Sequence, residues 1–235
     1  MKIEILFPEF CNLFGDLANI TYLKKCLPDA EIIETHLNEE PRFIQEKIDL
    51  IYLGPMTENT QEKVINKLEQ YKEKIIEKIN SNTVFLFTGN AFEILGEYIE
   101  NEDNTKINGL GIIDIYSKRD MFHRYNSLFL GEYEDIKIVG YKNQFSHSYG
   151  DNSDKYFIKA IRGAGLNKES ELEGIRINNF IGTTILGPIL VLNPLFTKKL
   201  MLLLGENIEK VAFEEEAIIA YKKRLEEFED LKREI

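Results

Sequence analysis

One stretch, residues 84–96, limits more than any other what this chain can fold into. The apolar run Val-Phe-Leu-Phe is followed by Thr88 and then by Gly89 and Asn90, two residues that favour a tight turn. Apolar residues at helical spacing come directly after the turn. The pattern therefore predicts a strand, a turn and a helix. In α/β enzymes such an elbow presents a Cys or Ser at its apex, but the apex here is Gly89, which has no side chain.

Strands and helices are predicted to alternate on the N-terminal side of this stretch. Short apolar runs at residues 3–7, 31–34 and 49–53 are typical of strands. Residues 19–27 and 59–80 have apolar side chains at three- and four-residue steps, as in amphipathic helices. Such alternation indicates βαβ units and a parallel sheet.

The middle of the chain has a different pattern. Gly, Asn, Asp and Ser rather than helices separate its strand-like runs, which predicts an antiparallel or mixed edge of the sheet. These runs are residues 111–116, 127–130, 136–141 and 156–161. A strand pattern at 174–185 and helices at 194–204 and 211–235 follow. We expect residues 1–235 to form a single α/β domain with a mostly parallel central sheet, helices on both faces and a mixed edge.

Composition excludes several classes of function. Lys and Arg number 29 against 40 Asp and Glu, and the net charge of −11 repels a nucleic-acid backbone. The longest apolar run, near residues 185–192, is interrupted by Gly187 and Pro188, so we expect no membrane span. The start, MKIEILF, has an acidic residue among apolar ones and no small-residue cleavage site, so we expect a first strand rather than a signal peptide, and a cytoplasmic location. Cys11 and Cys26 are too few for a metal cluster or a disulfide framework. No metal and no cofactor are expected.

Five stretches carry longer motifs. They are LFPEFCNLFGDLAN at 6–19, LGPMTENTQ at 53–61, GNAFEILG at 89–96, GLGIID at 109–114, and GTTILGPIL at 182–190 followed by NP. In this order they resemble motifs of the CobB/CobQ-like (cobyric acid synthase-like) branch of the class I glutamine amidotransferases, in particular the glutaminase subunits of lipid II isoglutaminyl synthases. The resemblance implies a flavodoxin-like three-layer fold.

The resemblance also implies a reaction and its residues. Family members hydrolyse glutamine and pass the ammonia to a synthetase partner, using a thiolate, a His and backbone donors around an oxyanion. The matching nucleophile position is Gly89 and the base position is Leu186, while Gln144 stands where the family has another His. In the oxyanion-side turn of Gly54, Pro55 and Met56, the last two residues replace glycines, and Pro55 has no N–H.

Several polar residues of the family site remain. Arg124 matches an Arg that is thought to face the active site in close relatives, and a guanidinium there can hold a carboxylate. The ligand-binding candidates, for a small amino-acid-like ligand, are Arg124, Asn90, Asn143, Glu58 and Glu93. Asp16, Asn19 and Glu173 also remain from the family motifs.

Three hypotheses follow. The first is an amidotransferase-like protein that has lost glutaminase chemistry and serves as a binding or regulatory subunit, paired with a Mur-ligase-like synthetase that uses free ammonia. The second is an enzyme that uses the same pocket for different small-molecule chemistry. The third is a glutaminase with a relocated apparatus, for which Thr88 as nucleophile or His147 as base are the candidates. Cys11, among Phe10, Leu13 and Phe14, is expected to be a packed thiol.

Overall fold

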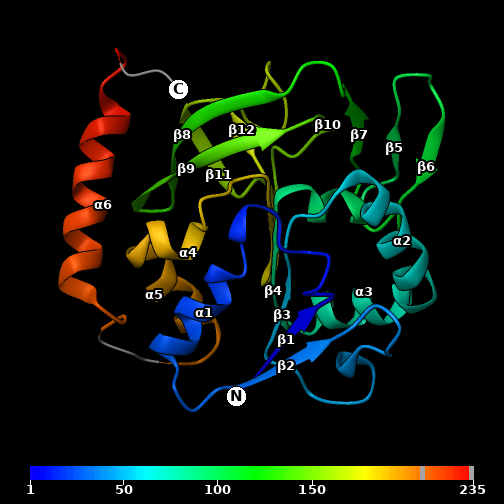
Figure 1. Cartoon of the computed structure of the whole chain (residues 1–235), viewed down its shortest axis with the longest axis horizontal. Coiled ribbons are helices and arrows are strands. Elements are labelled where there is room, and N and C mark those ends of the chain that lie inside the picture. Colours follow the sequence, from blue (N-terminus) through cyan, green and yellow to red (C-terminus); the bar gives the residue numbers. More distant parts are fainter. Residues whose placement is uncertain (207–209, 233–235) are drawn as a thin grey trace.

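The computed structural model describes residues 1–206 and 210–232, and a six-stranded sheet lies at its centre (Figure 1). The strand order is β13-β14-β4-β3-β1-β2, in which all neighbours are parallel except β13 and β14. The strands are β1 (Lys2–Leu6), β2 (Glu31–Thr35), β3 (Leu50–Leu53), β4 (Val84–Thr88), β13 (Ile175–Ile177) and β14 (Phe180–Thr183). The predicted α/β class with a mostly parallel central sheet is confirmed, and β13 makes one edge mixed.

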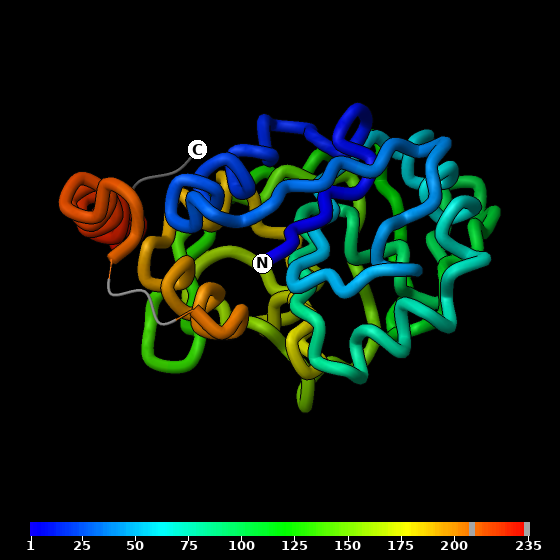
Figure 2. Tube along the Cα trace, turned by 90° about the horizontal axis from the view of Figure 1, so that it is seen from below, coloured from blue at the N-terminus to red at the C-terminus, as the bar shows by residue number. Residues whose placement is uncertain are grey.

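Side chains alternate between the two faces of this sheet because successive residues of a strand point in opposite directions. Phe85 and Phe87 of β4 belong to the core that includes α2 (Glu58–Leu68) and α3 (Lys72–Asn80). Val84 and Leu86 belong to the core on the other face. That face is covered by α1 (Ala18–Cys26), α4 (Ile189–Leu192) and α5 (Pro194–Leu203), and Figure 2 shows the two helical layers on either side of the sheet.

The helix predicted over residues 59–80 consists of α2 and α3, joined by a single 3-10 turn, η3 (Glu69–Tyr71). The apolar stripe that predicted the helix, with Val64, Leu68, Ile75 and Ile79, is buried against the sheet as expected.

The strands of the middle region do not extend the central sheet; they form two four-stranded sheets, β10-β7-β5-β6 and β12-β11-β8-β9. They are β5 (Tyr98–Glu100), β6 (Lys106–Asn108), β7 (Tyr116–Arg119), β8 (Tyr125–Tyr133), β9 (Ile136–Gln144), β10 (Ser146–Tyr149), β11 (Ile158–Arg162) and β12 (Leu172–Glu173). The strand predicted at 111–116 begins only at Tyr116, since the preceding backbone binds the segment after β4.

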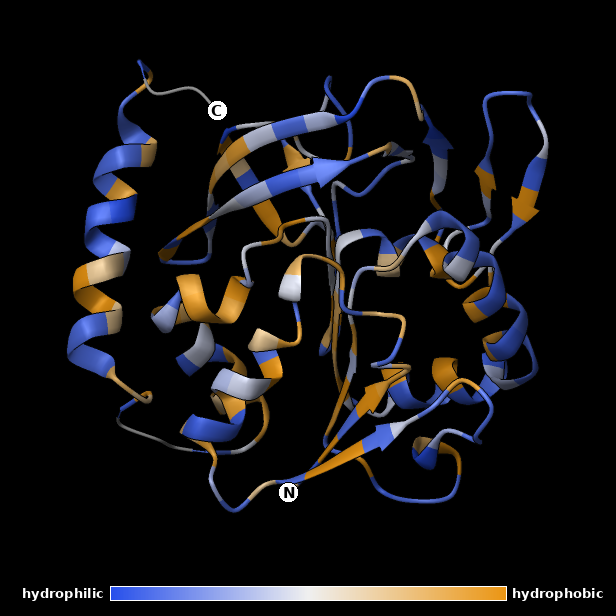
Figure 3. Cartoon of the chain, in the orientation of Figure 1, coloured by the Kyte–Doolittle hydropathy of each residue, from blue (hydrophilic) through white to orange (hydrophobic). Residues whose placement is uncertain are grey.

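Burial on both faces explains why the β8–β9 hairpin forms a layer of its own. Phe129 and Ile138 pack in the core that contains α5, whereas Leu130 and Val139 pack under α6 (Glu214–Glu229). Helix α6 is the closing helix predicted over 211–235, of which residues 233–235 lie outside the described residues. Its surface is hydrophilic along most of its length (Figure 3), as expected of a helix that buries one narrow stripe.

The order of the parallel strands in the central sheet reverses at β1: β2 lies on one side of it, and β3, β4 and β14 follow on the other. In parallel sheets ligands bind outside the carboxyl ends of the strands at such a reversal. The segments that follow β1, β3, β4 and β14 therefore meet at the edge where a site is expected. Within residues 1–206 and 210–232, no helix combines the length and the apolar character needed to cross a membrane.

Candidate functional site

A cavity of about 260 Å³ lies at this carboxyl edge. Segments after β1, β3, β4 and β14 form its walls, together with residues around the β9–β10 junction and Arg124. The lining residues are Leu13, Phe14, Pro55, Met56, Thr57, Glu58, Gly89, Asn90, Glu93, Arg124, Asn143, Gln144, Phe145, Ser146, Thr184 and Leu186. The structure thus brings together the five ligand-binding candidates and the three family catalytic positions. Of the oxyanion-side turn, Pro55 and Met56 line the cavity and Gly54 does not.

The elbow at Gly89 is present, but it leaves no room for a side chain. Gly89 has φ +61°, the left-handed region that suits glycine. A Cβ atom added there would lie 2.5 Å from Pro55 Cβ and 3.3 Å from Leu186 Cδ2. Pro55 therefore fills the position that the first side-chain atom of a nucleophile would need.

The helix predicted after the elbow is present, and it is a 3-10 helix, η4 (Gly89–Leu95), rather than an α-helix. Residues 109–113 explain the difference. The Leu110 N–H donates to the Ile94 carbonyl at 2.8 Å, and the Ile112 and Ile113 N–H groups donate to the Leu95 carbonyl at 2.8 and 3.0 Å. These carbonyls are thus used by a distant segment and not by a following helical turn.

The last two residues of the oxyanion-side turn offer no free backbone donor. Pro55 lacks an N–H, and the Met56 N–H donates to Asn90 Oδ1 at 3.0 Å. Asn90 Nδ2 returns a hydrogen bond to the Met56 carbonyl at 2.8 Å. The Asn90 amide therefore closes the turn like a short β-bridge, and it takes up the donor that an oxyanion would require.

Gly54 is held close to the N-terminal loop. A Cβ atom there would come within 2.4 Å of the Cys11 carbonyl oxygen. The Cys11 thiol is buried beside Met56, with Sγ 3.9 Å from Sδ, and burial raises its pKa to about 12. It is a packed thiol, as predicted, because a thiolate is disfavoured there. Among the described residues no group of three His, Cys, Asp or Glu side chains is arranged to hold a metal.

Thr88 points away from the cavity. Its buried hydroxyl donates to Asp16 Oδ2, and the Tyr52 hydroxyl donates to the same carboxylate oxygen at 2.5 Å. Burial raises the pKa of Asp16. Asn19 completes this group by accepting the Leu190 N–H at 2.9 Å. Asp16 and Asn19 thus connect the loop after β1 to the central sheet and to α4. Their role is structural.

Leu186 and Gln144 are the residues that the motif resemblance matches to histidines of the family. Leu186 forms an isolated bridge with Tyr141, through N–H to carbonyl bonds of 2.8 and 3.0 Å, and its side chain lines the cavity. Gln144 Nε2 donates to the Ser146 carbonyl at 2.6 Å. Gln144 Oε1 is buried and accepts no hydrogen bond within the described part of the chain. Gln144 therefore lines the cavity with a buried acceptor that has no partner among the described residues.

His147 lies outside the cavity lining. One ring nitrogen is 3.2 Å from Gln144 Nε2, and the ring packs edge-on against Tyr125 at 5.3 Å. Burial, followed by the charges of Lys168 and Lys142, lowers the pKa of His147. The imidazole is thus held neutral in a contact with β8.

Glu93 is a buried carboxylate in the cavity wall. It accepts hydrogen bonds from Gln61 Nε2 at 3.0 Å and from Ser146 Oγ at 2.5 Å. Burial raises the pKa of Glu93 despite these donors. Arg119, which the sequence analysis missed, donates to Gln61 Oε1 at 2.8 Å and so supports the same wall from β7. No motif identifies Arg119, because its partners are far away along the chain.

Arg124, Glu58 and Asn143 have uncommitted side chains. The Arg124 guanidinium stacks on the Phe145 ring, 4.4 Å from its centroid. Within residues 1–206 and 210–232, none of these three side chains forms a hydrogen bond or an ion pair. They present a cation, an anion and an amide to the cavity.

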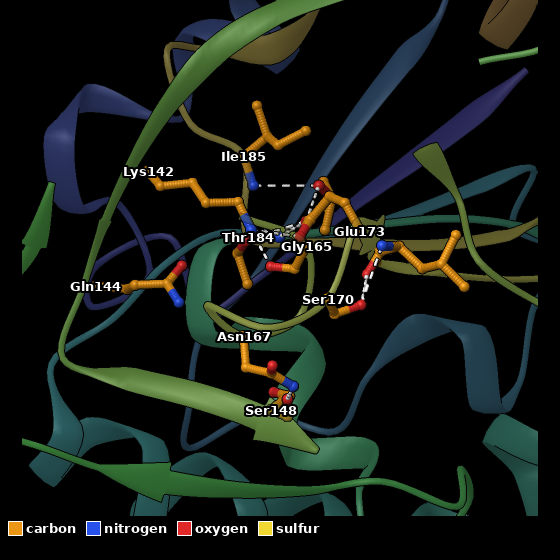
Figure 4. Close-up of polar contacts among 12 residues, drawn as sticks. Lys142, Gln144, Ser148, Gly165, Asn167, Ser170, Glu173, Thr184 and Ile185 are labelled. Carbon is orange, nitrogen blue, oxygen red and sulfur yellow. Dashed lines mark hydrogen bonds and ion pairs between the residues drawn. The ribbon is translucent and has the colours of Figure 1, made fainter. Parts of the chain in front are cut away.

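A buried ion pair between Lys142 and Glu173 lies next to Thr184, a residue of the cavity lining (Figure 4). Lys142 Nζ of β9 lies 2.5 Å from Glu173 Oε2 of β12, and neither side chain is exposed. Glu173 Oε1 accepts the Thr184 N–H at 2.8 Å and two threonine hydroxyls. Burial lowers the pKa of Lys142. The pair therefore fixes Thr184, a lining residue; Glu173 was among the sequence candidates and Lys142 was missed.

Comparison with known proteins identifies the family to which the chain is similar. The model of the CobB/CobQ-like glutamine amidotransferase domain matches residues 2–191. The lipid II isoglutaminyl synthase (glutamine-hydrolyzing) subunit GatD of Streptococcus pneumoniae (strain ATCC BAA-255 / R6) is 27% identical over 99% of this chain and 92% of that protein. The subunit of the same name from Staphylococcus aureus (strain N315) is 26% identical over 77% of this chain and 75% of that protein.

Solved structures agree on the fold. PurLQS from Thermotoga maritima superposes with a TM-score of 0.55 at 11% identity, covering 95% of this chain and 98% of that chain. A glutamine amidotransferase from the same organism has a TM-score of 0.54 at 11% identity, covering 98% of this chain and 86% of that chain. The predicted class I glutamine amidotransferase type of fold is confirmed.

Proposed function

Since the chain belongs to the CobB/CobQ-like glutamine amidotransferase domain family, shown by the match over residues 2–191, we propose that it keeps the cavity of that family but has lost glutamine hydrolysis. Residues 1–235 act as one amidotransferase-like domain in this proposal. The cavity binds a small ligand, and the protein serves as a binding or regulatory subunit.

The observation that carries the proposal is the contact at position 89. Nucleophilic hydrolysis of an amide needs a side chain at the elbow and donors around the oxyanion. Pro55 occupies the space of that side chain, and Asn90 occupies the Met56 N–H. The contact of Pro55 at position 89 and the hydrogen bond of Asn90 to the Met56 N–H together close the reaction centre. A single chance substitution would not produce both.

A relocated apparatus has little support. A threonine nucleophile needs a base beside it and a substrate within reach. The Thr88 hydroxyl is bound to Asp16 outside the cavity lining, and the His147 ring packs on Tyr125. Neither side chain lines the cavity, and the described residues show no contact between the two.

An enzyme of another kind is the second candidate, and Glu93 favours it. A carboxyl group whose pKa burial raises, in a cavity wall, is a common acid or base catalyst. Both oxygens of Glu93, however, already accept hydrogen bonds from Gln61 and Ser146. We therefore rank this candidate below a binding role.

The uncommitted groups fit an amino-acid-like ligand. Arg124 can hold a carboxylate by paired hydrogen bonds, and its stacking on Phe145 restricts the guanidinium plane. Glu58 supplies a negative charge in the same cavity for an ammonium group. Asn143 and Gln144 add neutral hydrogen-bonding groups.

For a partner we propose a Mur-ligase-like synthetase. The two curated relatives are named as subunits of lipid II isoglutaminyl synthase, and a chain without glutaminase chemistry leaves a synthetase to use free ammonia. The experiment is to co-express the chain with the Mur-ligase-like synthetase of its own genome and to assay the purified complex with glutamine or ammonium as the nitrogen source.

We expect amidation with ammonium and less than 1% of that rate with glutamine, because loss of nucleophile and base removes several orders of magnitude of rate. Amidation driven by glutamine at a comparable rate would contradict the proposal. The same synthetase without this chain is the control for a regulatory effect on the ammonium-driven rate.

A further inference from the structure

The hydrogen-bonding capacity of the cavity is distributed unevenly. Uncommitted charged and polar side chains, namely those of Arg124, Glu58 and Asn143, belong to segments other than the elbow. The part around the elbow is lined by Pro55, Met56 and Leu186 side chains and by Gly89, while the Asn90 and Glu93 side chains there are already bonded to Met56, Gln61 and Ser146. The cavity therefore combines a polar region with an apolar one.

The backbone groups of Pro55, Met56 and Leu186 offer no donor to an amide group. Pro55 has no N–H, and the Met56 N–H is bound to Asn90 Oδ1. The backbone N–H and carbonyl of Leu186 are both paired with Tyr141. A ligand carboxamide placed there would lose its bonds to water without finding these partners, which is unfavourable for a buried polar group.

We infer that the cavity selects an α-amino acid, free or at the end of a peptide, with an apolar side chain, and discriminates against glutamine. The inference rests on the proposed function and adds the ligand class. Arg124 and Glu58 hold the carboxylate and the ammonium group, and the side chain lies against Pro55, Met56 and Leu186. The substitutions that close the reaction centre thereby change what the site binds.

Methionine and glutamine form a suitable pair of probes because both side chains are unbranched and of similar length, and only one carries an amide. Isothermal titration of the full chain is expected to give an affinity for L-methionine about tenfold to a hundredfold higher than for L-glutamine, the factor that an unpaired buried amide imposes. Ammonia is measured in the same samples.

Two variants test the assignment of the apolar region. Leu186→Asn places an amide beside the ligand side chain and should reduce the preference for methionine to less than threefold. Asn90→Ala frees the Met56 N–H, which can then donate to a ligand amide, and it should also reduce the preference for methionine to less than threefold. Leu202→Asn, an exposed position on α5, is the matched control and should leave the preference unchanged.

The outcomes separate the two proposals. Equal or tighter binding of glutamine, without ammonia release, would overturn the apolar selectivity and leave the loss of hydrolysis standing. Binding of neither amino acid would overturn the selectivity as well. Glutamine that is bound and hydrolysed would overturn the proposed function itself.

Discussion

The variant Gly89→Cys is expected to be inactive as a glutaminase and to unfold more easily than the wild type by about 2–5 kcal/mol. A left-handed conformation costs a residue with a Cβ about 1–2 kcal/mol, and forcing extra atoms into a packed site costs about 1–3 kcal/mol more. At Gly89 both costs apply, because φ is +61° and the new Cβ would lie 2.5 Å from Pro55 Cβ. Urea unfolding measures the difference.

Gly15 provides the matched control. It has φ +70° but no atom within 4 Å of an added Cβ, so Gly15→Cys should lose only the conformational part, about 1–2 kcal/mol. The double variant Gly89→Cys with Pro55→Gly should regain part of the packing loss, since the two residues are in contact. Equal free energies of unfolding for the Cys variants at positions 15 and 89 would show that Pro55 does not fill the nucleophile's place.

The second large effect is expected at the buried ion pair. Lys142→Met should lower the free energy of unfolding by about 3–5 kcal/mol, because it leaves the Glu173 carboxylate buried without its cation. Lys137→Met is the control: Lys137 pairs with Glu229 at 2.6 Å, but both side chains are over 40% exposed, so its loss should cost less than about 1 kcal/mol.

A combined variant, Lys142→Met with Glu173→Gln, should regain stability relative to Lys142→Met alone, since an amide keeps an oxygen for the Thr183 and Thr184 donors. Thermal and urea unfolding of the four proteins give the comparison. If Lys142→Met and Lys137→Met lower the free energy of unfolding by the same small amount, the Lys142–Glu173 pair does not stabilise the cavity wall at Thr184.

The local pattern of apolar residues is sufficient to predict the strands of the central sheet and the helices that cover it. Buried parallel strands such as β3 and β4 are short apolar runs, and α1 and α2 have clear helical periodicity. Motif resemblance added the expected roles of positions 89 and 186 as nucleophile and base positions. These features depend on residues close together in the sequence or on fixed motifs.

The features that were missed depend on contacts between distant segments. Residues 109–113 bind the carbonyls of Ile94 and Leu95 and so shorten the elbow helix. The Asn90 amide reaches Met56, 34 positions away, and Lys142 finds Glu173, 31 positions away. Neither the closed turn nor the open cavity beside it follows from periodicity, since both require the three-dimensional arrangement of the loops.

Ammonia release from glutamine by the purified chain tests the central claim most directly. The assay uses the full chain alone, with Arg124→Ala as the cavity variant and Arg224→Ala, on α6, as a matched arginine control. The account predicts no release above the buffer blank for any of the three proteins. Release by the wild type that persists in Arg224→Ala and disappears in Arg124→Ala would show a working glutaminase in this cavity and would contradict the account.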